Sequence, residues 1–281
     1  LEDETVVGVI PSIGYVHRGL EKLVDKRDYK QYTYVAERIC GICSCGHGLG
    51  YCLAVEQIMN IEVPDRARYL RTIWVEMSRV HSHLLWLGLL ADAMGFESLH
   101  MESWRLREKI LDMFDETTGG RIIHSVNQVG GVQKDMDSTM LNDILHAIDD
   151  IEKQMKPIVK TFLHDYTVQS RLKGVGVLSK DDALAQGAVG PMLRASGVEY
   201  DARLLGYGAY KDLTVEPIIS KDGDSYGRCE VRLKELFQSF DLIREAIGKI
   251  PQGDISVPVK GNPDGEYFVR IEQPRGEAIY Y

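Results

Sequence analysis

ERICGICSCGH, residues 37–47, holds three of the five cysteines of this chain. Cys40 and Cys43 are three residues apart, so on one helical turn both sulfurs would project to the same side of the backbone. Arg38 would place a fixed positive charge near both thiols, and a nearby cation favours the thiolate, which is the form that binds metals. His47 follows one turn after Cys43, where it could hydrogen-bond a bound sulfur. Two thiolates from one turn supply half of a tetrahedral site for a soft metal.

Other cysteine chemistries fit this spacing less well. A thioredoxin-type redox pair should follow a strand in a βαβ unit, whereas the preceding DYKQYTY, residues 28–34, is polar and rich in tyrosine. A zinc site would need a second CxxC or paired histidines at finger spacing, and an iron–sulfur cluster would need four cysteines at ferredoxin spacing. The pattern therefore predicts an incomplete site for a soft metal.

Composition narrows the class of protein. With 281 residues the chain is long enough for a large core, in one domain or two. A net charge of −9 argues against nucleic acid as a partner. Five cysteines, three of them clustered, indicate a reduced cytosolic protein and not a disulfide scaffold. The longest apolar run, residues 84–96, is interrupted by Asp92 and is too short to span a bilayer.

Hydrophobic periodicity predicts a mainly α chain with small β elements. Helices are expected over about 43–60, 65–94, 101–118, 136–168 and 229–249. Pro64 and Asp65 suit the first turn of the second helix. Short strands are expected within residues 5–16 and, with one short helix, within 174–226. The tail around Pro274-Arg275-Gly276 is typical of a hairpin.

The other cysteines, histidines and arginines have simpler interpretations. Three cysteines are expected to pack as small apolar side chains: Cys45, Cys52 and Cys229. His81 and His83 would face about 200° apart on a helix, so they cannot share a metal and are expected to be packing or surface residues. Four arginines are expected on a solvated or inter-subunit face: Arg66, Arg68, Arg71 and Arg79.

Beyond the cysteine motif, an ordered series of motifs resembles the large subunits of [NiFe] hydrogenases. The matching segments are residues 51–56, 61–71, 82–88, 104–108 and 130–132, followed by Asp135. HRGLEKL, residues 17–23, and QPRGE, residues 273–277, are shared with the quinone-site (49 kDa-type) subunit of respiratory complex I. The combination is similar to the energy-converting, Ech-type hydrogenases, which are the closest hydrogenase relatives of complex I. The match covers essentially the whole chain.

This resemblance implies a single large-subunit domain over residues 1–281 with long central helices. Residues 1–36 would hold N-terminal strands and a proton-relay turn. Residues 37–170 would hold the metal-motif loop and the helical core, and residues 171–281 a mixed α/β part. Within the first part, Glu21 would pass protons to and from the cysteine ligands. A buried carboxyl with a raised pKa suits that task near neutral pH.

The resemblance also implies a Ni–Fe centre, with carbon monoxide and cyanide on the iron, held by four cysteine thiolates. Cys40 would be a terminal nickel ligand, and Cys43 would bridge nickel and iron. His47 would donate a hydrogen bond to a ligand sulfur, and Arg38 would support the site with its charge. Full-length relatives carry a second CxxC after the PRGE run. We therefore expect a C-terminally incomplete chain, with two more ligands beyond residue 281, that is inactive alone.

The implied function is that of the catalytic subunit of a membrane-associated hydrogenase, which interconverts dihydrogen, protons and electrons. Its expected partners are an iron–sulfur small subunit, membrane ion-pumping subunits and, through them, ferredoxin. The expected location is peripheral, on the cytoplasmic side of a membrane. The alternative is a metal-free connector of complex I type, which reduces a quinone or sulfur. Retention of Cys40, Cys43 and His47 favours the hydrogenase, because complex I-type relatives lack those cysteines. A stand-alone zinc or redox module is the third possibility.

Overall fold

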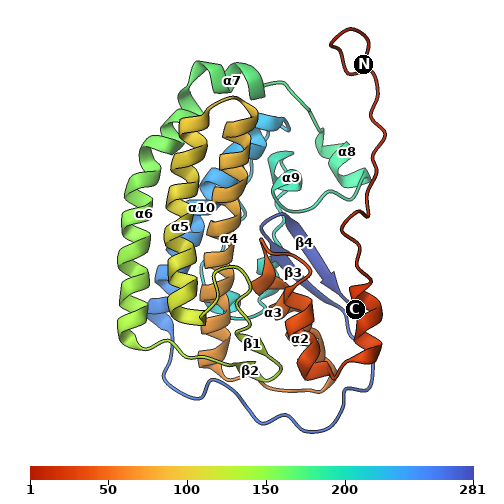
Figure 1. The fold of residues 1–281 in the computed structure, drawn as a ribbon, viewed down its shortest axis with the longest axis vertical. Helices are drawn as coiled ribbons and strands as arrows, with labels where there is room; N and C mark the ends of the chain where they lie inside the picture. The colour runs from red at the N-terminus through yellow and green to blue at the C-terminus, as the bar shows by residue number, and fades with distance from the viewer.

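Four long helices form a bundle in the computed structural model, which describes residues 1–281. They are α4 (Asp65–Ala93), α5 (Glu97–Thr118), α6 (Ser138–His164) and α10 (Ser225–Lys249). Helix α4 packs against α5 and α10, and α6 packs against the same two helices (Figure 1). None of the helices combines the length and the apolar character needed to cross a membrane.

Local signals explain where these helices begin and end. Asp137 and Asp224 cap α6 and α10, since their carboxylates accept hydrogen bonds from the main-chain N–H groups of the first turn. Helix α4 starts directly after Pro64 with Asp65 in its first turn. Helix α5 ends at Gly119, whose φ of 77° is a left-handed conformation that glycine adopts without strain.

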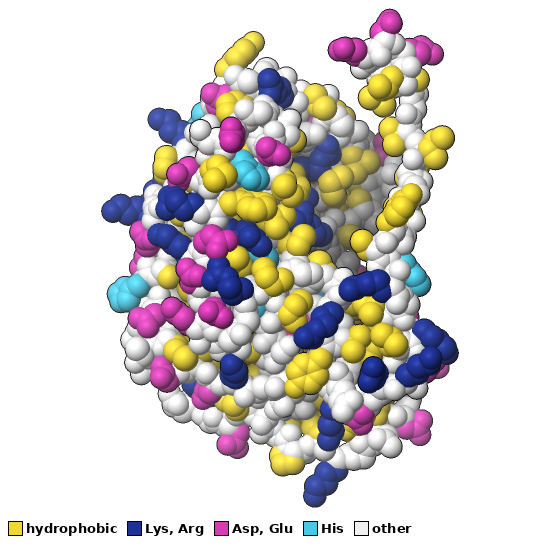
Figure 2. All heavy atoms as spheres, in the orientation of Figure 1, with side chains coloured by type: hydrophobic (Ala, Val, Ile, Leu, Met, Phe, Trp, Pro, Cys, Tyr) yellow, Lys and Arg dark blue, Asp and Glu magenta, His cyan; other side chains and the backbone are white.

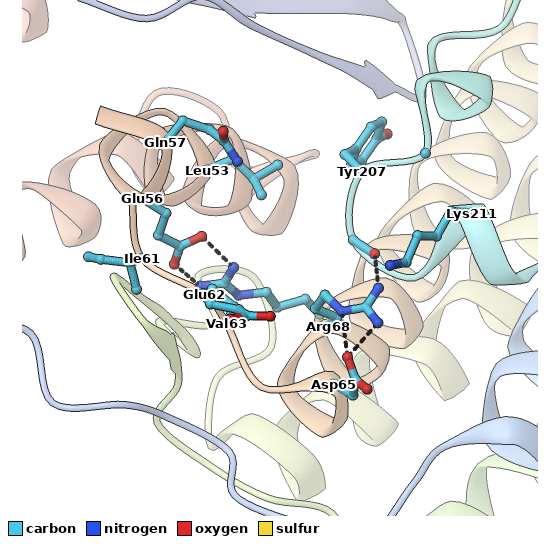
Figure 3. Close-up of a pocket in the computed structure, with 13 residues that line it drawn as sticks. Leu53, Glu56, Gln57, Ile61, Glu62, Val63, Asp65, Arg68, Tyr207 and Lys211 are labelled. Atoms are coloured by element: carbon cyan, nitrogen blue, oxygen red, sulfur yellow. Dashed lines mark hydrogen bonds and ion pairs between the residues drawn. The ribbon is translucent and has the colours of Figure 1, made fainter. Parts of the chain in front are cut away.

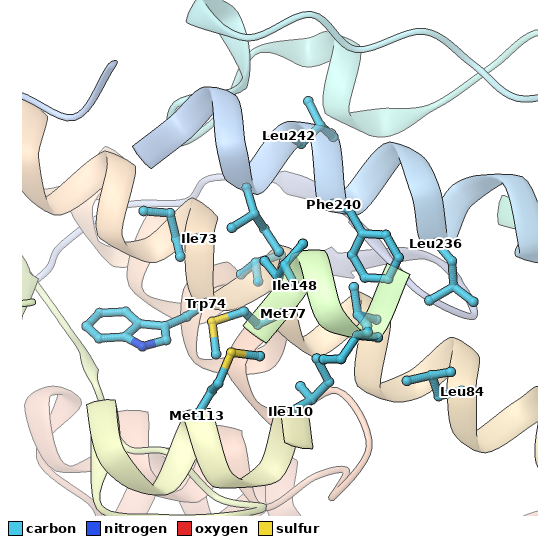
Figure 4. Packing of buried hydrophobic residues seen from close by; sticks show 14 of the residues in the cluster. Ile73, Trp74, Met77, Leu84, Ile110, Met113, Ile148, Leu236, Phe240 and Leu242 are labelled. Atoms are coloured by element: carbon cyan, nitrogen blue, oxygen red, sulfur yellow. The ribbon is translucent and has the colours of Figure 1, made fainter. Parts of the chain in front are cut away.

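The core lies between the four helices. Ile73, Trp74 and Met77 of α4 face Ile110 and Phe240 of α5 and α10 in a continuous apolar cluster (Figure 4). The indole N–H of Trp74 donates to the Thr117 hydroxyl at 3.1 Å, which satisfies the one polar group of that buried ring. Burial of this cluster is the main favourable contribution to folding.

Smaller elements cover one side of the bundle. Helices α2 (Tyr29–Glu37) and α3 (Ser44–Ile58) pack together, and α3 also contacts α4 and an antiparallel hairpin. The hairpin consists of β3 (Val269–Gln273) and β4 (Gly276–Tyr280), joined by Pro274-Arg275. A second pair, β1 (Asn127–Gln128) and β2 (Gly131–Val132), lies against α3 and α4. The remaining elements are α1 (Leu20–Leu23), η1 (Val24–Lys26), α7 (Tyr166–Leu172), α8 (Lys180–Ala185), α9 (Gly190–Ala195), η2 (Ala202–Leu205) and η3 (Tyr210–Asp212).

The predicted fold class, mainly α with small β elements, is confirmed, as are the hairpin around Pro274 and the expected helices other than the end of the one over 136–168. The strands expected in residues 5–16 and 174–226 are wrong. The first segment has only an isolated bridge between Glu2 and Thr5, because no second strand lies beside it to complete a ladder. The second contains α8, α9, η2 and η3 instead.

The helix expected over 136–168 is also wrong at its end. Asp165 closes α6, and its carboxylate accepts from the N–H groups of Thr167 and Val168 to start the separate helix α7. The N-terminal arm, residues 1–19, extends away from the bundle with its apolar side chains exposed (Figures 1 and 2). These side chains are Val6, Val7, Val9, Ile10, Ile13, Tyr15 and Val16.

The expectation that the arginines of α4 form a solvated face is wrong for three of the four. Arg66, Arg71 and Arg79 are buried. Each pairs with a carboxylate within 3.2 Å, which is how a charge is accommodated in an interior. The partners are Asp135, Glu56 and Glu76 respectively.

Truncation of a core side chain tests this packing. Phe240 is fully buried between the bundle helices, so Phe240→Ala should lower the free energy of unfolding by about 3–5 kcal/mol through lost burial and an unfilled cavity. Tyr166→Ala, at a side chain exposed to water, is the matched control and should change it by less than about 0.5 kcal/mol. Urea unfolding measures both, and equal losses in the two variants would contradict the assignment of the core.

Candidate metal centre

The cysteine motif lies in the turn between α2 and α3. Helix α2 ends at Glu37, and Cys43 is the residue that caps the start of α3. Cys40 and Cys43 therefore do not share a helical turn, and that part of the prediction is wrong. Gly41, a poor helix former, lies between them and is exposed in the turn. The turn nevertheless brings both sulfurs together, as the spacing predicted.

Three donor atoms meet at this turn. The sulfurs of Cys40 and Cys43 and a ring nitrogen of His47 all lie within 4.8 Å of one another. Cys43 is buried, whereas Cys40 and His47 are half-buried and open toward the surface. A soft cation bound here would thus meet two sulfurs and an imidazole, a donor set suited to transition metals.

The two thiols share one proton. The pKa of Cys40 is lowered to about 3, chiefly because the Cys43 thiol donates a hydrogen bond to its sulfur, with burial acting in the opposite direction. His47 and the Ile42 N–H, which lies 3.4 Å from that sulfur, add to the lowering. The same hydrogen bond raises the pKa of Cys43, and burial raises it further. Cys40 is therefore the thiolate of the pair and Cys43 the thiol.

A cation other than the expected one faces these sulfurs. Arg38 is exposed, and its guanidinium donates to the Tyr34 carbonyl at 2.6 Å. The Arg275 guanidinium, at the tip of the β3–β4 hairpin, instead lowers the pKa of Cys43 through its charge. Burial lowers the pKa of Arg275 itself, and the two cysteines oppose that effect. The QPRGE motif was visible in the sequence, but nothing in it indicated contact with a turn so far away along the chain.

The hairpin also positions His47. The Tyr280 hydroxyl of β4 hydrogen-bonds to His47 Nδ1. Burial raises the pKa of Tyr280, so its hydroxyl keeps its proton at neutral pH. The bond to Tyr280 orients the ring of His47, which in turn lowers the pKa of Cys40 through a hydrogen bond. A side chain at Gly50 would meet the Tyr280 ring at 2.6 Å, so glycine is required for this approach.

Glu37 is a buried carboxylate that the sequence analysis did not single out. One oxygen accepts the Ser125 N–H at 2.6 Å, whereas the other has no hydrogen-bond partner. Burial without a paired cation raises its pKa to about 7. Ser125 adopts a φ of 52°, an uncommon conformation for a residue with a side chain, and its N–H bond to Glu37 helps to hold it there.

Glu21 lies apart from the buried groups. Its side chain, on α1, is 82% exposed, and its carboxylate is 3.5 Å from His17, which is also exposed. The buried setting that the sequence analysis linked to a proton relay is thus not found at this residue. The other cysteines are packed as expected: Cys45, Cys52 and Cys229 are fully buried. His81 and His83 are buried on α4 and do not share a site, since His83 pairs with Glu235.

A cavity with ionised walls lies elsewhere in the molecule. A hollow of about 350 Å³ opens between α3, α4 and the loop before η3. Figure 3 shows the Glu56 carboxylate in its wall and, farther along, the guanidinium of Arg68 bound to Asp65. Two of its cations, Arg68 and Arg71, pair with Asp65 and Glu56, and none of its lining residues belongs to the cysteine site. The paired sulfurs therefore lie at a turn outside this cavity.

Comparisons with known proteins identify the family of this chain. Residues 93–262 match the family described as "Respiratory-chain NADH dehydrogenase, 49 Kd subunit", and residues 18–94 match "Nickel-dependent hydrogenase". The whole chain is 38% identical to the alpha subunit of the membrane-bound hydrogenase of Pyrococcus furiosus, over 70% of that protein. It is 35% identical to the D subunit of the F(420)H(2) dehydrogenase of Methanosarcina mazei, over 78% of that protein. It is also 36% identical to the C/D subunit of the NADH-quinone oxidoreductase of Phocaeicola vulgatus, over 55% of that protein.

A helical bundle with a thiol pair at its edge and these relatives define an oxidoreductase subunit. The chain belongs to the family that joins the 49 kDa subunit of respiratory NADH dehydrogenase with the alpha subunits of membrane-bound hydrogenases. The resemblance recognised in the sequence is thereby confirmed.

The unequal pKa values of the two thiols can be tested by alkylation. Because only thiolate reacts, Cys40 should be labelled by iodoacetamide at a rate that hardly changes between about pH 5.5 and 8.5. Mass spectrometry of the labelled peptides measures it, with Cys40→Ser as the control that should lose the fast phase. A rate that rises about tenfold per pH unit over that range would indicate an ordinary thiol and contradict the assignment.

Proposed function

We propose that this chain is the catalytic large subunit of an energy-converting [NiFe] hydrogenase, which interconverts dihydrogen, protons and electrons. The observation that supports it best is the paired sulfurs of Cys40 and Cys43 with His47 beside them. The match of residues 18–94 to nickel-dependent hydrogenases covers this same turn. The hydrogenase alpha subunit of Pyrococcus furiosus is similar over the whole chain.

The donor set fits half of a Ni–Fe centre. Cys40 and Cys43 would hold the metals, with Cys40 as a terminal nickel ligand and Cys43 as a bridge, and two further cysteine ligands would come from outside residues 1–281. Thiolates are soft ligands that suit redox-active nickel. When bound, such a centre supplies heterolytic cleavage of dihydrogen.

The residues of this chain have definable tasks around that centre. Cys40, already a thiolate, can accept a proton at its sulfur. His47, oriented by Tyr280, can donate a hydrogen bond to the same sulfur and so fix its direction. The Arg275 guanidinium supplies positive charge beside both sulfurs. Glu21 would exchange protons between this site and water, a task for which its exposed carboxylate has direct access to solvent.

The proposed partners follow from the same family. The three remaining cysteines are fewer than the four that an iron–sulfur cluster usually needs, so an iron–sulfur small subunit would carry electrons from ferredoxin. Membrane subunits would couple the reaction to ion pumping. We place the chain at the cytoplasmic side of the membrane, docked on those subunits.

A second candidate function is electron transfer without a metal, as a connector of complex I type that reduces a quinone or sulfur. The match of residues 93–262 to the 49 Kd subunit family, and the names of two similar proteins, favour it. In that case the thiol pair would have no metal to hold. Nickel binding therefore separates the two candidates.

Cysteine substitution in the assembled complex tests the proposal. Cys43→Ser replaces a soft sulfur by a hard hydroxyl, so nickel content and hydrogenase activity should fall by about tenfold or more. Cys229→Ser, at a buried thiol far along the chain on α10, is the matched control and should keep its nickel. Elemental analysis and hydrogen-dependent dye reduction measure the two quantities. Full nickel and activity in Cys43→Ser would reject the hydrogenase in favour of the connector.

A second test concerns the proton route. Glu21→Gln retains shape and hydrogen bonding but cannot carry a proton, so turnover in the complex should drop by about 10²-fold or more while the metal centre keeps its normal spectrum. Glu4→Gln, another exposed carboxylate of the N-terminal segment, should turn over normally. Wild-type turnover in Glu21→Gln would show that protons move by another route.

A further inference from the structure

A second group of ionisable residues is sealed inside the protein, away from the cysteine turn. It joins α4, α9, η2, α10 and β3, and all of its charged side chains are buried. Its carboxylates are Glu76, Asp201, Glu235 and Glu272, and its guanidiniums are Arg79, Arg194 and Arg203. Four negative charges thus face three positive ones. A net charge in a buried cluster is costly, and binding one proton removes it.

The carboxylates are not equally compensated. Glu76 accepts hydrogen bonds from Arg79, from the Tyr210 hydroxyl and from Ser239, the last at 2.7 Å, and Arg203 lies 3.4 Å away. The carboxylate of Asp201 accepts two bonds from the Arg203 guanidinium, at 3.0 and 2.7 Å. These two carboxylates therefore have a cation each and are held ionised.

Glu235 and Glu272 depend on a single guanidinium. Arg194 Nη2 lies 2.8 Å from an oxygen of each. Arg194 Nε donates to Glu235 at 2.9 Å, and His83 Nε2 is 2.8 Å from its other oxygen. The contact with Glu272 is not aligned as a hydrogen bond, so Glu272 Oε1 has no donor. The other Glu272 oxygen accepts only the Ala202 N–H, at 3.1 Å.

The surroundings of Glu272 disfavour a negative charge there. Glu277, its cross-strand neighbour in the hairpin, is a second carboxylate, paired with Arg270 at 3.5 Å. Burial is the largest influence on the pKa of Glu272 and raises it, and Arg194 is the largest opposing one. Asp201 raises the pKa as well, whereas Arg79 and Arg203 lower it, and the net direction is upward. The hydroxyl of Tyr207 accepts the main-chain N–H of Glu272 at 2.9 Å and forms no hydrogen bond with its carboxyl group.

His83 is the other group of the cluster able to take a proton, and it is the poorer site. Burial lowers its pKa to about 4, against the effect of Glu235. Arg232 of α10 stacks 4.2 Å from the Trp86 ring and forms no ion pair with the carboxylates. Its charge, like that of Arg79, opposes a second cation on His83.

We propose that this buried cluster is a site for one proton and that Glu272 holds it at neutral pH. With that proton, three carboxylates balance three guanidiniums. The proposal rests on the buried charges alone and holds whether or not the chain is a hydrogenase. It has a consequence for the cysteine turn, because β3 continues from Glu272 into Gln273, which packs on Gly46, and into the turn that carries Arg275. A proton gained or lost at Glu272 would therefore change the charge of the strand that leads into the turn with Arg275.

Two substitutions within the cluster separate this proposal from a conventional ion-pair network. Glu272→Gln mimics the protonated carboxyl and should leave stability at pH 8 unchanged or higher. Glu76→Gln removes a fully compensated charge and leaves Arg79 without its partner, so it should unfold at clearly lower urea concentration. Measured on the full chain, equal destabilisation by both substitutions would mean that Glu272 is ionised and would overturn the proposal.

The pH dependence gives the second readout. A carboxyl with a raised folded-state pKa contributes stability that is complete below its unfolded pKa of about 4.3 and is lost as pH rises through the folded pKa. Between the unfolded pKa and the folded pKa, the folded-to-unfolded ratio of the wild type should therefore fall, relative to that of Glu272→Gln, by up to about tenfold per pH unit.

Infrared spectroscopy detects a protonated carboxyl group directly. Its first measurement uses the wild type, so it does not depend on whether a variant folds. The wild type at pH 6 should show protonated-carboxyl absorption, one component of which disappears in Glu272→Gln. Glu37, with a pKa of about 7, supplies a second component, which Glu37→Gln removes. If all of the absorption is lost in Glu37→Gln, or none is present at pH 6, Glu272 carries no proton and the proposal fails.

Discussion

The Arg194 guanidinium, which lies 2.8 Å from an oxygen of Glu235 on α10 and 2.8 Å from an oxygen of Glu272 on β3, is the group on which the arrangement of the site depends. It links the C-terminal hairpin to the helical bundle in the interior of the protein. Removal of Arg194 would leave the buried Glu235 carboxylate without its guanidinium, so this link is costly to break. Arg79 strengthens the attachment, because its guanidinium donates to the main-chain carbonyl of Glu272 at 2.9 Å.

The hairpin in turn completes the chemistry of the cysteine turn. Cys40, Cys43 and His47 come together through local chain geometry, but the groups that set their charge and orientation are Arg275 and Tyr280. The thiolate character of Cys40 arises from hydrogen bonds within the turn. The cation beside the pair and the hydrogen-bond partner of His47 Nδ1 come from the hairpin. Ligand atoms and their supporting partners thus come from opposite ends of the chain.

Features that depend on residues close together in the chain could be predicted from the sequence. Pro64, Gly119 and the hairpin turn at Pro274-Arg275 carry local signals, and the CxxC spacing placed two sulfurs at one turn. Asp165 was a usable helix stop that apolar periodicity over 136–168 concealed. Features formed by distant residues could not be predicted in this way. Arg79 meets Glu272 from 193 positions away, so an arginine at helical spacing gave no sign that it would be buried. His47 likewise meets Tyr280 across 233 positions, and such contacts depend on the complete fold.

Cys40 and Cys43 are, in the function proposed here, ligands of nickel. X-ray absorption at the nickel edge, measured on the assembled protein, is the most direct test. We expect one nickel per chain in a shell dominated by sulfur, which loses sulfur scattering or the metal itself when Cys40 is replaced by serine. A protein without nickel, or a nickel shell of oxygen and nitrogen that is unchanged by that substitution, would contradict it.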